Sequence, residues 1–169
     1  MVLRKWNKAD LDSLVKYANN EKIYAYLRNI FPMPYTKEDG KLFLEIASNT
    51  PDEEEFLRAI DCQGEAIGTI VLRRETDIHS LCGEIGFWLG EPFWGKGIMT
   101  EAVKQVVNYG FETMGLVRVW GEVFDFNRGS ARVLEKAGFV KEATLRKRIY
   151  KAGLVSDSYI YAIVKEGNL

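Results

Sequence analysis

Residues 84–107 constrain the fold of this chain most strongly. A short apolar run at 85–89 is followed by the glycine-spaced turn Trp94-Gly95-Lys96-Gly97. A segment with helical periodicity then opens at Thr100. Its apolar residues recur at steps of three and four, which places them on one helical face: Met99, Ala102, Val103, Val106, Val107 and Gly110. The pattern predicts a strand, a glycine loop and a helix N-terminus in direct succession.

A strand, a glycine loop and a helix N-terminus in this order can bind an anion. The first N–H groups of a helix have no partner within the helix, and the helix dipole adds positive potential there. Gly95 and Gly97 allow the backbone to approach a phosphate with no Cβ in the way. The alternative is a simple chain reversal, since glycine turns often join strands to helices. Two common phosphate-loop patterns, GxxxxGK[ST] and GxGxxG, are absent from this stretch.

Two motifs resemble the Gcn5-related N-acetyltransferases, in particular the RimJ/RimL-like branch of ribosomal-protein and spermidine acetyltransferases. The run PFWGKGIMTEAV is similar to the acyl-coenzyme-A loop of that family, [QR]xxGx[GA], although Trp94 replaces Gln or Arg and Met99 replaces Gly or Ala. Downstream, residues 127–139 are similar to the signature NxxSxxxxEKxGF. The resemblance extends over residues 3–164. It implies an acetyl-CoA-dependent N-acetyltransferase that transfers the acetyl group directly to a primary amine.

The resemblance also implies a set of cofactor-binding residues. The backbone of Phe87, Trp88 and Leu89 would pair with the pantetheine arm of coenzyme A. The amides of residues 95–100 would hold its pyrophosphate, and Asn127 and Ser130 would also contact the cofactor. The complete set expected to bind acetyl-CoA is Phe87, Trp88, Leu89, Trp94, Gly95, Lys96, Gly97, Ile98, Met99, Thr100, Asn127 and Ser130. For Asn127 the alternative is a helix N-cap, and for Ser130 it is an ordinary surface serine.

The order of apolar segments predicts an α+β fold in one domain, residues 1–169. Strands are expected at 3–6, 56–61, 66–73, 81–89, 117–124, 139–149 and 158–164. Helices are expected after Asn7 or Asp10, from Thr36, at 100–114 and at 127–137. The helix after Thr36 is expected to bury Leu42, Phe43 and Ile46. Together with the family resemblance, this order predicts a mixed, mostly antiparallel sheet of about six to seven strands with helices on both faces.

Composition narrows the classes of function. The 169 residues carry a formal net charge of -1, which argues against a nucleic-acid-binding surface. No apolar run approaches the roughly 20 residues of a membrane span, and the N-terminus has no signal-peptide pattern. Two cysteines without metal spacing, Cys62 and Cys82, and one histidine, His79, predict a cytoplasmic protein with no metal site. We therefore expect neither nucleic-acid nor membrane partners.

Glu84 is the best candidate for a general base. It lies in an otherwise apolar strand, and period-two alternation places it on one face with Gly86 and Trp88. An apolar strand should partly desolvate the carboxylate, which would make it a better base. A peptide α-amine, with a pKa of about 7.7–8.0, needs only a modest base. The alternative for Glu84 is a structural ion pair with an arginine.

The sequence offers several candidates for the general acid, the group that protonates the leaving thiolate. Many family members carry a tyrosine seven residues after the asparagine of the signature, and Leu134 stands there in this chain. Ser130, Tyr161 and water remain as candidates. An acyl-enzyme on Cys82 is disfavoured because no nearby group would activate that thiol.

The acceptor side of the site is predicted from position alone. Tyr26, Arg28, Phe31 and Tyr35 resemble the variable early segment that lines the acceptor cleft in this family. The alternative is aromatic packing over a helix. A basic run, Lys141, Arg146, Lys147, Arg148 and Lys151, is interpreted as a solvated strand face rather than a binding surface.

The sequence also allows two other functions and a homodimeric assembly. The chain could be an acyl-CoA-binding module or sensor with little transferase activity, or a nucleotide-binding protein that uses the same loop. The C-terminal strands could also pair between two subunits of a homodimer.

Overall fold

The computed structural model describes residues 1–167. The strands in this part of the chain are β1 (Val2–Arg4), β2 (Glu55–Cys62), β3 (Glu65–Arg74), β4 (Cys82–Leu89), β5 (Arg118–Phe124), β6 (Val140–Lys151) and β7 (Leu154–Val164). The α-helices are α1 (Leu11–Ala18), α2 (Glu21–Tyr24), α3 (Lys37–Asn49), α4 (Ile98–Glu112) and α5 (Arg128–Lys136). Short 3-10 helices are η1 (Lys8–Asp10), η2 (Asp77–His79) and η3 (Glu91–Phe93).

The strands form one sheet in the order β1-β2-β3-β4-β5-β7-β6. β4 and β5 pair in parallel, whereas β5 with β7 and β7 with β6 pair antiparallel. The predicted fold class, a mixed α+β fold with a mostly antiparallel sheet, is confirmed. The chain divides into two compact units, Met1–Val71 with Gly86–Ile98 and Leu72–Ile85 with Met99–Leu169.

In the first unit, β1 is tied to the start of the first helical segment by Arg4. β1 pairs antiparallel with β2, and the Arg4 guanidinium lies 2.8 Å from Asp61 through Nε and 2.7 Å from Asp10 Oδ1 through Nη2. Asp10 also accepts the Asn7 backbone N–H in a capping box. Burial disfavours the ionised Asp10 carboxylate, but the bonds from Arg4 and Asn7 outweigh it and lower the pKa of Asp10.

We expect Asp10→Asn to reduce the free energy of unfolding by about 1–3 kcal/mol at neutral pH, because a nearly buried charge-assisted bond is lost. Since the pKa of Asp10 is lowered in the folded state, its contribution is present above the ordinary carboxyl pKa and is lost as the pH falls from about 5 towards 2. Urea unfolding from pH 7 to 3 should therefore show a flatter decline for the variant. Asp12→Asn is the control, since the exposed Asp12 pairs with Lys37 on the surface. An equal loss in both variants would contradict the prediction.

β2 and β3 are consecutive, neighbouring strands joined by a tight hairpin turn. Gln63 and Gly64 form its two-residue turn, and both have positive φ, 58° and 87°. The Gly64 N–H donates to Asp61 Oδ1 at 2.8 Å, so the turn is also held by a side chain. The conformation suits a tight hairpin because its twist matches that of the flanking strands.

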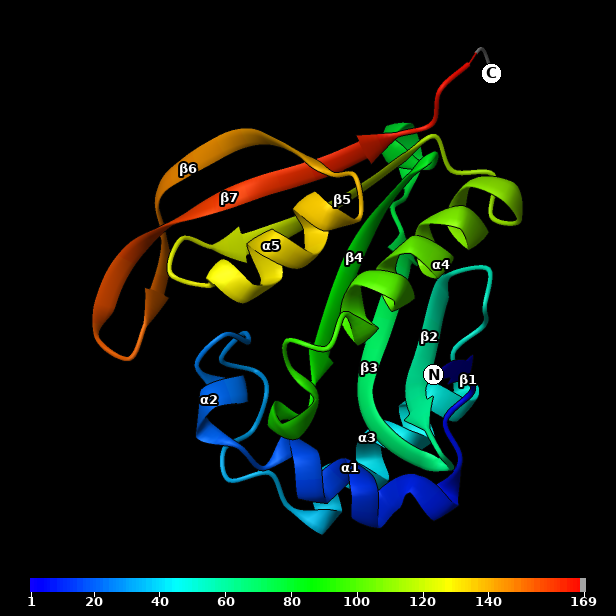
Figure 1. Cartoon of the computed structure of the whole chain (residues 1–169), viewed down its shortest axis with the longest axis vertical. Coiled ribbons are helices and arrows are strands. Elements are labelled where there is room, and N and C mark those ends of the chain that lie inside the picture. Colours follow the sequence, from blue (N-terminus) through cyan, green and yellow to red (C-terminus); the bar gives the residue numbers. More distant parts are fainter. Residues whose placement is uncertain (168–169) are drawn as a thin grey trace. The chain divides into compact units, whose positions relative to one another are not determined.

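The predicted buried face of α3 is wrong for two of its three residues. Leu42 and Ile46 are 59% and 54% exposed, whereas Gly40 and Leu44 are buried. A Cβ at Gly40 would lie 2.8 Å from Leu11 Cδ1, so this glycine allows close approach of α3 to α1 (Figure 1). The buried face of α3 therefore follows Gly40 and Leu44, which lie one helical turn apart. The prediction chose Leu42 and Ile46 instead because Gly40 has no hydrophobic side chain to mark the face it shares with Leu44.

In the second unit, the buried face of α4 is the predicted one. Met99, Ala102, Val103, Val106, Val107 and Gly110 are all buried. A Cβ at Gly110 would lie 2.7 Å from Leu72 Cδ2 and 3.4 Å from Leu116 Cδ1, so α4 sits close against the residues that flank it in this unit. The helix begins at Ile98, two residues before the predicted start at Thr100.

β6 and β7 form a long, curved hairpin (Figure 1). The pairing shifts between Leu145 and Ile149, where three residues of β6 face one residue of β7. Lys147 adopts φ 53° in this bulge, and its N–H donates to Asp157 Oδ1 at 2.8 Å. Of the five residues in the predicted solvated face, Lys151 is the exception, and the other four are exposed: Lys141, Arg146, Lys147 and Arg148. Lys151 is buried, and burial lowers the pKa of its ammonium group.

Candidate active site

The glycine loop joins β4 to α4 through η3. Gly95 and Gly97 have φ values of 74° and 78°, in the left-handed region that favours glycine. Residues 94–97 are exposed, and α4 starts immediately after them, at Ile98. The N–H groups of the first turn of α4 therefore come directly after an exposed turn. Gly95 and Gly97 have no side chains, so a ligand can approach the backbone at these two positions. Loops of this kind bind phosphate groups.

Three of the predicted cofactor residues in this stretch can contribute only through their backbone, because their side chains are in the core. Trp88 and Met99 are both buried. Leu89 is buried as well, and its carbonyl already has a partner. The Trp94 indole Nε1–H donates to Leu89 O at 2.6 Å, and the next N–H, that of Gly90, donates to Ile67 O at 2.8 Å.

Trp94 thus has a structural role in the loop. It stands where the acyl-coenzyme-A loop pattern has Gln or Arg, and its side chain is 40% exposed. The hydrogen bond to Leu89 O fixes the beginning of the loop against the end of β4. Lys96, between the two glycines, is exposed and lies with Nζ 5.5 Å from the centre of the Phe93 ring.

Glu84 lies in β4 next to Trp120 of β5, according to the parallel register of the two strands. Its side chain is 22% exposed, and Oε2 is 3.9 Å from Arg73 Nη1. The alternative interpretation, an ion pair with an arginine, is therefore observed. The pair is long, and the Arg73 side chain is half exposed.

Glu122 is a second carboxylate on this face that the sequence interpretation missed. Val119, Gly121 and Val123 are buried on one face of β5, so Trp120 and Glu122 lie on the other. The hydroxyl of the fully buried Ser158 donates to Glu122 Oε1 at 2.5 Å, and Arg148 Nε lies 3.7 Å away. The signal was available, because Glu122 interrupts an apolar strand as Glu84 does.

Asn127 caps α5. Its Oδ1 accepts the Ser130 backbone N–H at 3.1 Å, and its Nδ2 donates to Ser130 Oγ at 2.9 Å. The N-cap alternative is therefore observed. Because Ser130 Oγ accepts this bond, its own hydroxyl proton can be donated to another group. Asn127 is buried and fixes the orientation of Ser130.

Tyr161 is a weaker candidate for the acid. It is 3% exposed, and its hydroxyl donates to Glu135 Oε1 of α5 at 3.2 Å. Burial, together with this bond, raises the pKa of Tyr161. Its proton is thus already committed to a carboxylate. Leu134, at the position where many family members carry a tyrosine, is fully buried.

The early segment brings two of its four predicted residues together in a packed cluster. The Phe31 and Tyr35 rings are 5.0 Å apart, and Phe31 lies edge-on to Trp88 at 6.3 Å. Tyr35 is buried, and burial, with a contribution from Asp39, raises its pKa to about 12. Aromatic packing, the alternative interpretation, therefore describes Phe31 and Tyr35. Tyr26 and Arg28 are exposed and accessible to a ligand.

The comparison with known families decides the identity of the fold. A family model described as an acetyltransferase (GNAT) domain matches residues 1–140. The chain belongs to the GNAT acetyltransferase family. It is an N-acetyltransferase, as are its named relatives. One of these, the uncharacterized N-acetyltransferase YnaD of Bacillus subtilis (strain 168), is 30% identical over 171 residues, which cover 98% of this chain and 94% of that protein.

Solved GNAT structures have the same fold. A GNAT acetyltransferase from Bacillus anthracis has a TM-score of 0.82 at 26% identity, covering 98% of this chain and 95% of its own. Spermidine N-acetyltransferase from Vibrio cholerae, in complex with CoA and spermine, has a TM-score of 0.79 at 23% identity, covering 96% and 94%. The ribosomal L7/L12 alpha-N-protein acetyltransferase RimL, in complex with coenzyme A, has a TM-score of 0.82 at 19% identity, covering 96% and 92%.

On the expectation that this GNAT loop binds coenzyme A, Trp94→Phe should weaken that binding about 3- to 10-fold. The variant keeps an aromatic ring but loses the N–H bond to Leu89, which is worth about 1 kcal/mol. Isothermal titration with desacetyl coenzyme A measures the affinity. Trp94→Gln is the comparison, since it restores the usual family residue and a side-chain N–H donor. Equal affinity in the wild type and the Phe variant would show that the indole bond does not hold the loop for the cofactor.

Further observations on the described part of this GNAT chain concern metal ligands, membrane spans, Cys82 and His79. Among residues 1–167, no group of three or more His, Cys, Asp or Glu side chains is arranged to hold a metal ion. Over the same residues, no helix has the length and apolar character needed to cross a membrane. Cys82 is a half-buried free thiol, and His79 is exposed.

Proposed function

We propose that this protein transfers the acetyl group of acetyl-CoA directly to a primary amine, either a protein N-terminal α-amine or a small-molecule amine. The observation that carries the proposal is the exposed loop with Gly95 and Gly97 at positive φ, leading straight into α4. The structural neighbours that bind CoA or acetyl-CoA in their solved complexes support the same cofactor. The proposal takes the whole chain, 1–169, as one acetyltransferase domain located in the cytoplasm.

The backbone and the glycine loop hold the cofactor in this proposal. Amide groups of Phe87 and Trp88 pair with the pantetheine arm, while the Leu89 carbonyl remains bonded to Trp94. The N–H groups of residues 95–100 bind the pyrophosphate, and the exposed Lys96 adds positive charge. Asn127 orients Ser130 through its two capping bonds.

The transfer itself needs a base and an acid. The amine nitrogen attacks the thioester carbonyl carbon, the C–N bond forms, and the C–S bond breaks with its electron pair on sulfur. Glu84 accepts the proton lost by the amine, directly or through water. Ser130 donates its hydroxyl proton to the leaving thiolate and is reprotonated from solvent. Ser130 is preferred over Tyr161 because the Tyr161 proton is bonded to Glu135.

The acceptor is proposed to enter along the early segment, where Tyr26 and Arg28 are exposed. Relatives among the solved structures are named for spermidine and for a ribosomal protein α-amine, and both are primary amines. An α-amine acceptor suits Glu84, because an amine with a pKa of about 7.7–8.0 is easily deprotonated near neutral pH. A homodimer through the exposed β6–β7 hairpin is part of the proposal.

Thermal unfolding with acetyl-CoA, desacetyl coenzyme A and ATP tests the cofactor assignment. Ligands that bind the folded state raise the midpoint with concentration. We expect both coenzyme A species to raise it and ATP not to. No shift with either coenzyme A species would overturn the proposal. A shift without thiol release across a panel of peptide and polyamine acceptors would instead support the second candidate, an acyl-CoA-binding module or sensor.

A further inference from the structure

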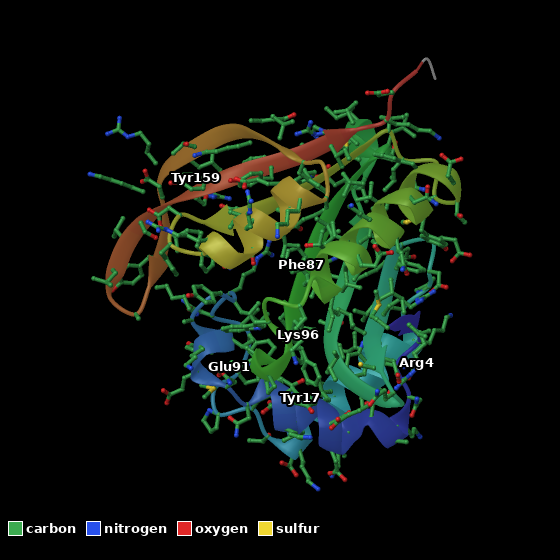
Figure 2. All side chains as sticks on the ribbon, in the orientation of Figure 1. Arg4, Tyr17, Phe87, Glu91, Lys96 and Tyr159 are labelled. Atoms are coloured by element: carbon green, nitrogen blue, oxygen red, sulfur yellow. The ribbon has the colours of Figure 1, made fainter. Side chains whose placement is uncertain are left out.

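Glu91 joins the early loop, defined here as residues 19–35, to the glycine loop. Glu91 is the first residue of η3, three residues before Trp94. Its Oε2 accepts a hydrogen bond from Asn20 Nδ2 at 2.9 Å, and its Oε1 accepts one from Lys22 Nζ. Figure 2 shows Glu91 beside α2. The carboxylate therefore contacts the beginning of the early loop from the beginning of the glycine loop.

Asn20 uses its whole amide group in this contact. Its Oδ1 accepts the N–H groups of Lys22 and Ile23, at 2.9 Å and 3.2 Å, and so caps α2. Its Nδ2 donates to Glu91. The first turn of α2 and the carboxylate of Glu91 are consequently held by one side chain. A displacement of Glu91 would shift the cap of α2.

Other contacts hold the early loop on one side of the Glu91–Asn20 bond and the start of the glycine loop on the other. Asn19 Oδ1 accepts the Tyr35 N–H at 3.1 Å, which closes the early loop at its two ends. On the other side, the Phe93 ring lies edge-on to Tyr17 at 5.4 Å. Gly90 has no room for a side chain, since a Cβ there would lie 2.9 Å from Tyr17 Cδ1. The start of the glycine loop is thus packed against α1 and bonded to α2.

We infer that Glu91 is a positioning residue that couples coenzyme A binding at the glycine loop to the order of the early loop. The inference rests on the proposed function, because it takes the glycine loop as the cofactor site and the early loop as the acceptor side. A ligand that fixes residues 94–100 also fixes Glu91, and Glu91 fixes Asn20 and α2. By linkage, an acceptor that orders the early loop raises the affinity for the cofactor by the same factor.

An exposed ion pair alone would contribute little to stability, about 0–1 kcal/mol. The expected signature of Glu91 is therefore a ligand-dependent change in the early loop rather than a large change in the unliganded protein. Hydrogen exchange measures this directly. It requires only desacetyl coenzyme A and no knowledge of the acceptor.

The experiment compares amide exchange with and without saturating desacetyl coenzyme A in four proteins: wild type, Glu91→Gln, Asn20→Asp and Glu65→Gln. Asn20→Asp keeps an N-cap acceptor for α2 but places a carboxylate against Glu91. Glu65→Gln is the matched control, because Glu65 forms a comparable surface pair with Lys16 of α1, at 2.7 Å, and both residues lie outside the early loop and the glycine loop. Thermal midpoints without ligand check that each variant is folded.

In the wild type and Glu65→Gln we expect coenzyme A to slow exchange both at residues 94–101 and at residues 20–35. In Glu91→Gln and Asn20→Asp the slowing at 94–101 should persist, while that at 20–35 should fall to less than half. Slowing at 94–101 without slowing at 20–35 in the wild type would overturn the inference and leave the proposed function standing. Equal slowing at 20–35 in all four proteins would also overturn it. No slowing at 94–101 in any protein would contradict the proposed function, and the inference with it.

Discussion

Glu84→Gln is expected to lower kcat by about 10²- to 10⁴-fold with little change in the affinity for acetyl-CoA. General base catalysis by a positioned carboxylate contributes this range, and the amide of Gln cannot accept the proton of the amine. The substitution keeps the size of the side chain, so β4 and its pairing with β5 at Trp120 should be retained. Thiol release with the most active acceptor of an amine panel measures the effect.

The pH dependence of the same variant provides a second test. Without a base, the enzyme depends on amine molecules that have already lost their proton in solution. The remaining rate of Glu84→Gln should therefore keep rising with pH up to the pKa of the acceptor. A profile and turnover unchanged from the wild type would exclude Glu84 as the base.

Glu122→Gln is the matched comparison, because it is the same substitution on the same face of the sheet. Glu122 is bonded to the buried hydroxyl of Ser158 and lies near Arg148. We expect its replacement to lower kcat less than about tenfold, since a carboxylate in two existing contacts is mainly structural. The opposite result, a large loss for Glu122→Gln and a small one for Glu84→Gln, would assign the base to Glu122.

Gly68→Ala is expected to reduce the free energy of unfolding by about 2–4 kcal/mol. A Cβ at Gly68 of β3 would lie 2.5 Å from Trp88 O and 3.0 Å from Leu89 Cα. Both are backbone atoms of β4, which cannot rotate away as a side chain can, so the strands must separate. The displaced segment is the one proposed to pair with pantetheine, so coenzyme A affinity should fall as well.

Urea unfolding and coenzyme A titration of Gly68→Ala check both effects. Gly129→Ala in α5 is the control, because the nearest atom to its added Cβ is Asn127 Oδ1 at 3.7 Å, an ordinary contact. Its stability should change by less than about 0.5 kcal/mol. A Gly68→Ala protein as stable as the wild type would show that β3 and β4 tolerate a wider spacing.

Local sequence patterns predicted the elements whose structure is determined within a few residues. The periodicity of α4 predicted its buried face, because residues three and four apart share one side of a helix. Gly95 and Gly97 predicted the loop because glycine adopts positive φ more easily than other residues, and both residues do so in the structure. The Asn127 cap also follows from its own place in the chain, since it bonds Ser130 three residues later.

Interactions between distant segments were not predictable in this way. The buried side of α3 depends on Gly40 packing against Leu11, which no periodicity of large apolar residues reveals. The bond of Trp94 to Leu89 and that of Asn20 to Glu91 join residues whose approach depends on the folded chain. Lys151 belongs to a basic run in the sequence but is buried in the structure.

The sequence by itself thus determined the family, the fold class and the strand–loop–helix segment at residues 84–107. The tertiary structure decided which side chains share a face. The register of β4 with β5 places Glu84 beside Trp120. The register of β5 with β7 pairs Phe124 with Ser158. Glu122 lies two residues before Phe124 and accepts a hydrogen bond from the Ser158 hydroxyl. Strand register depends on contacts between residues far apart in the chain, whereas helix periodicity and glycine conformations depend on neighbours.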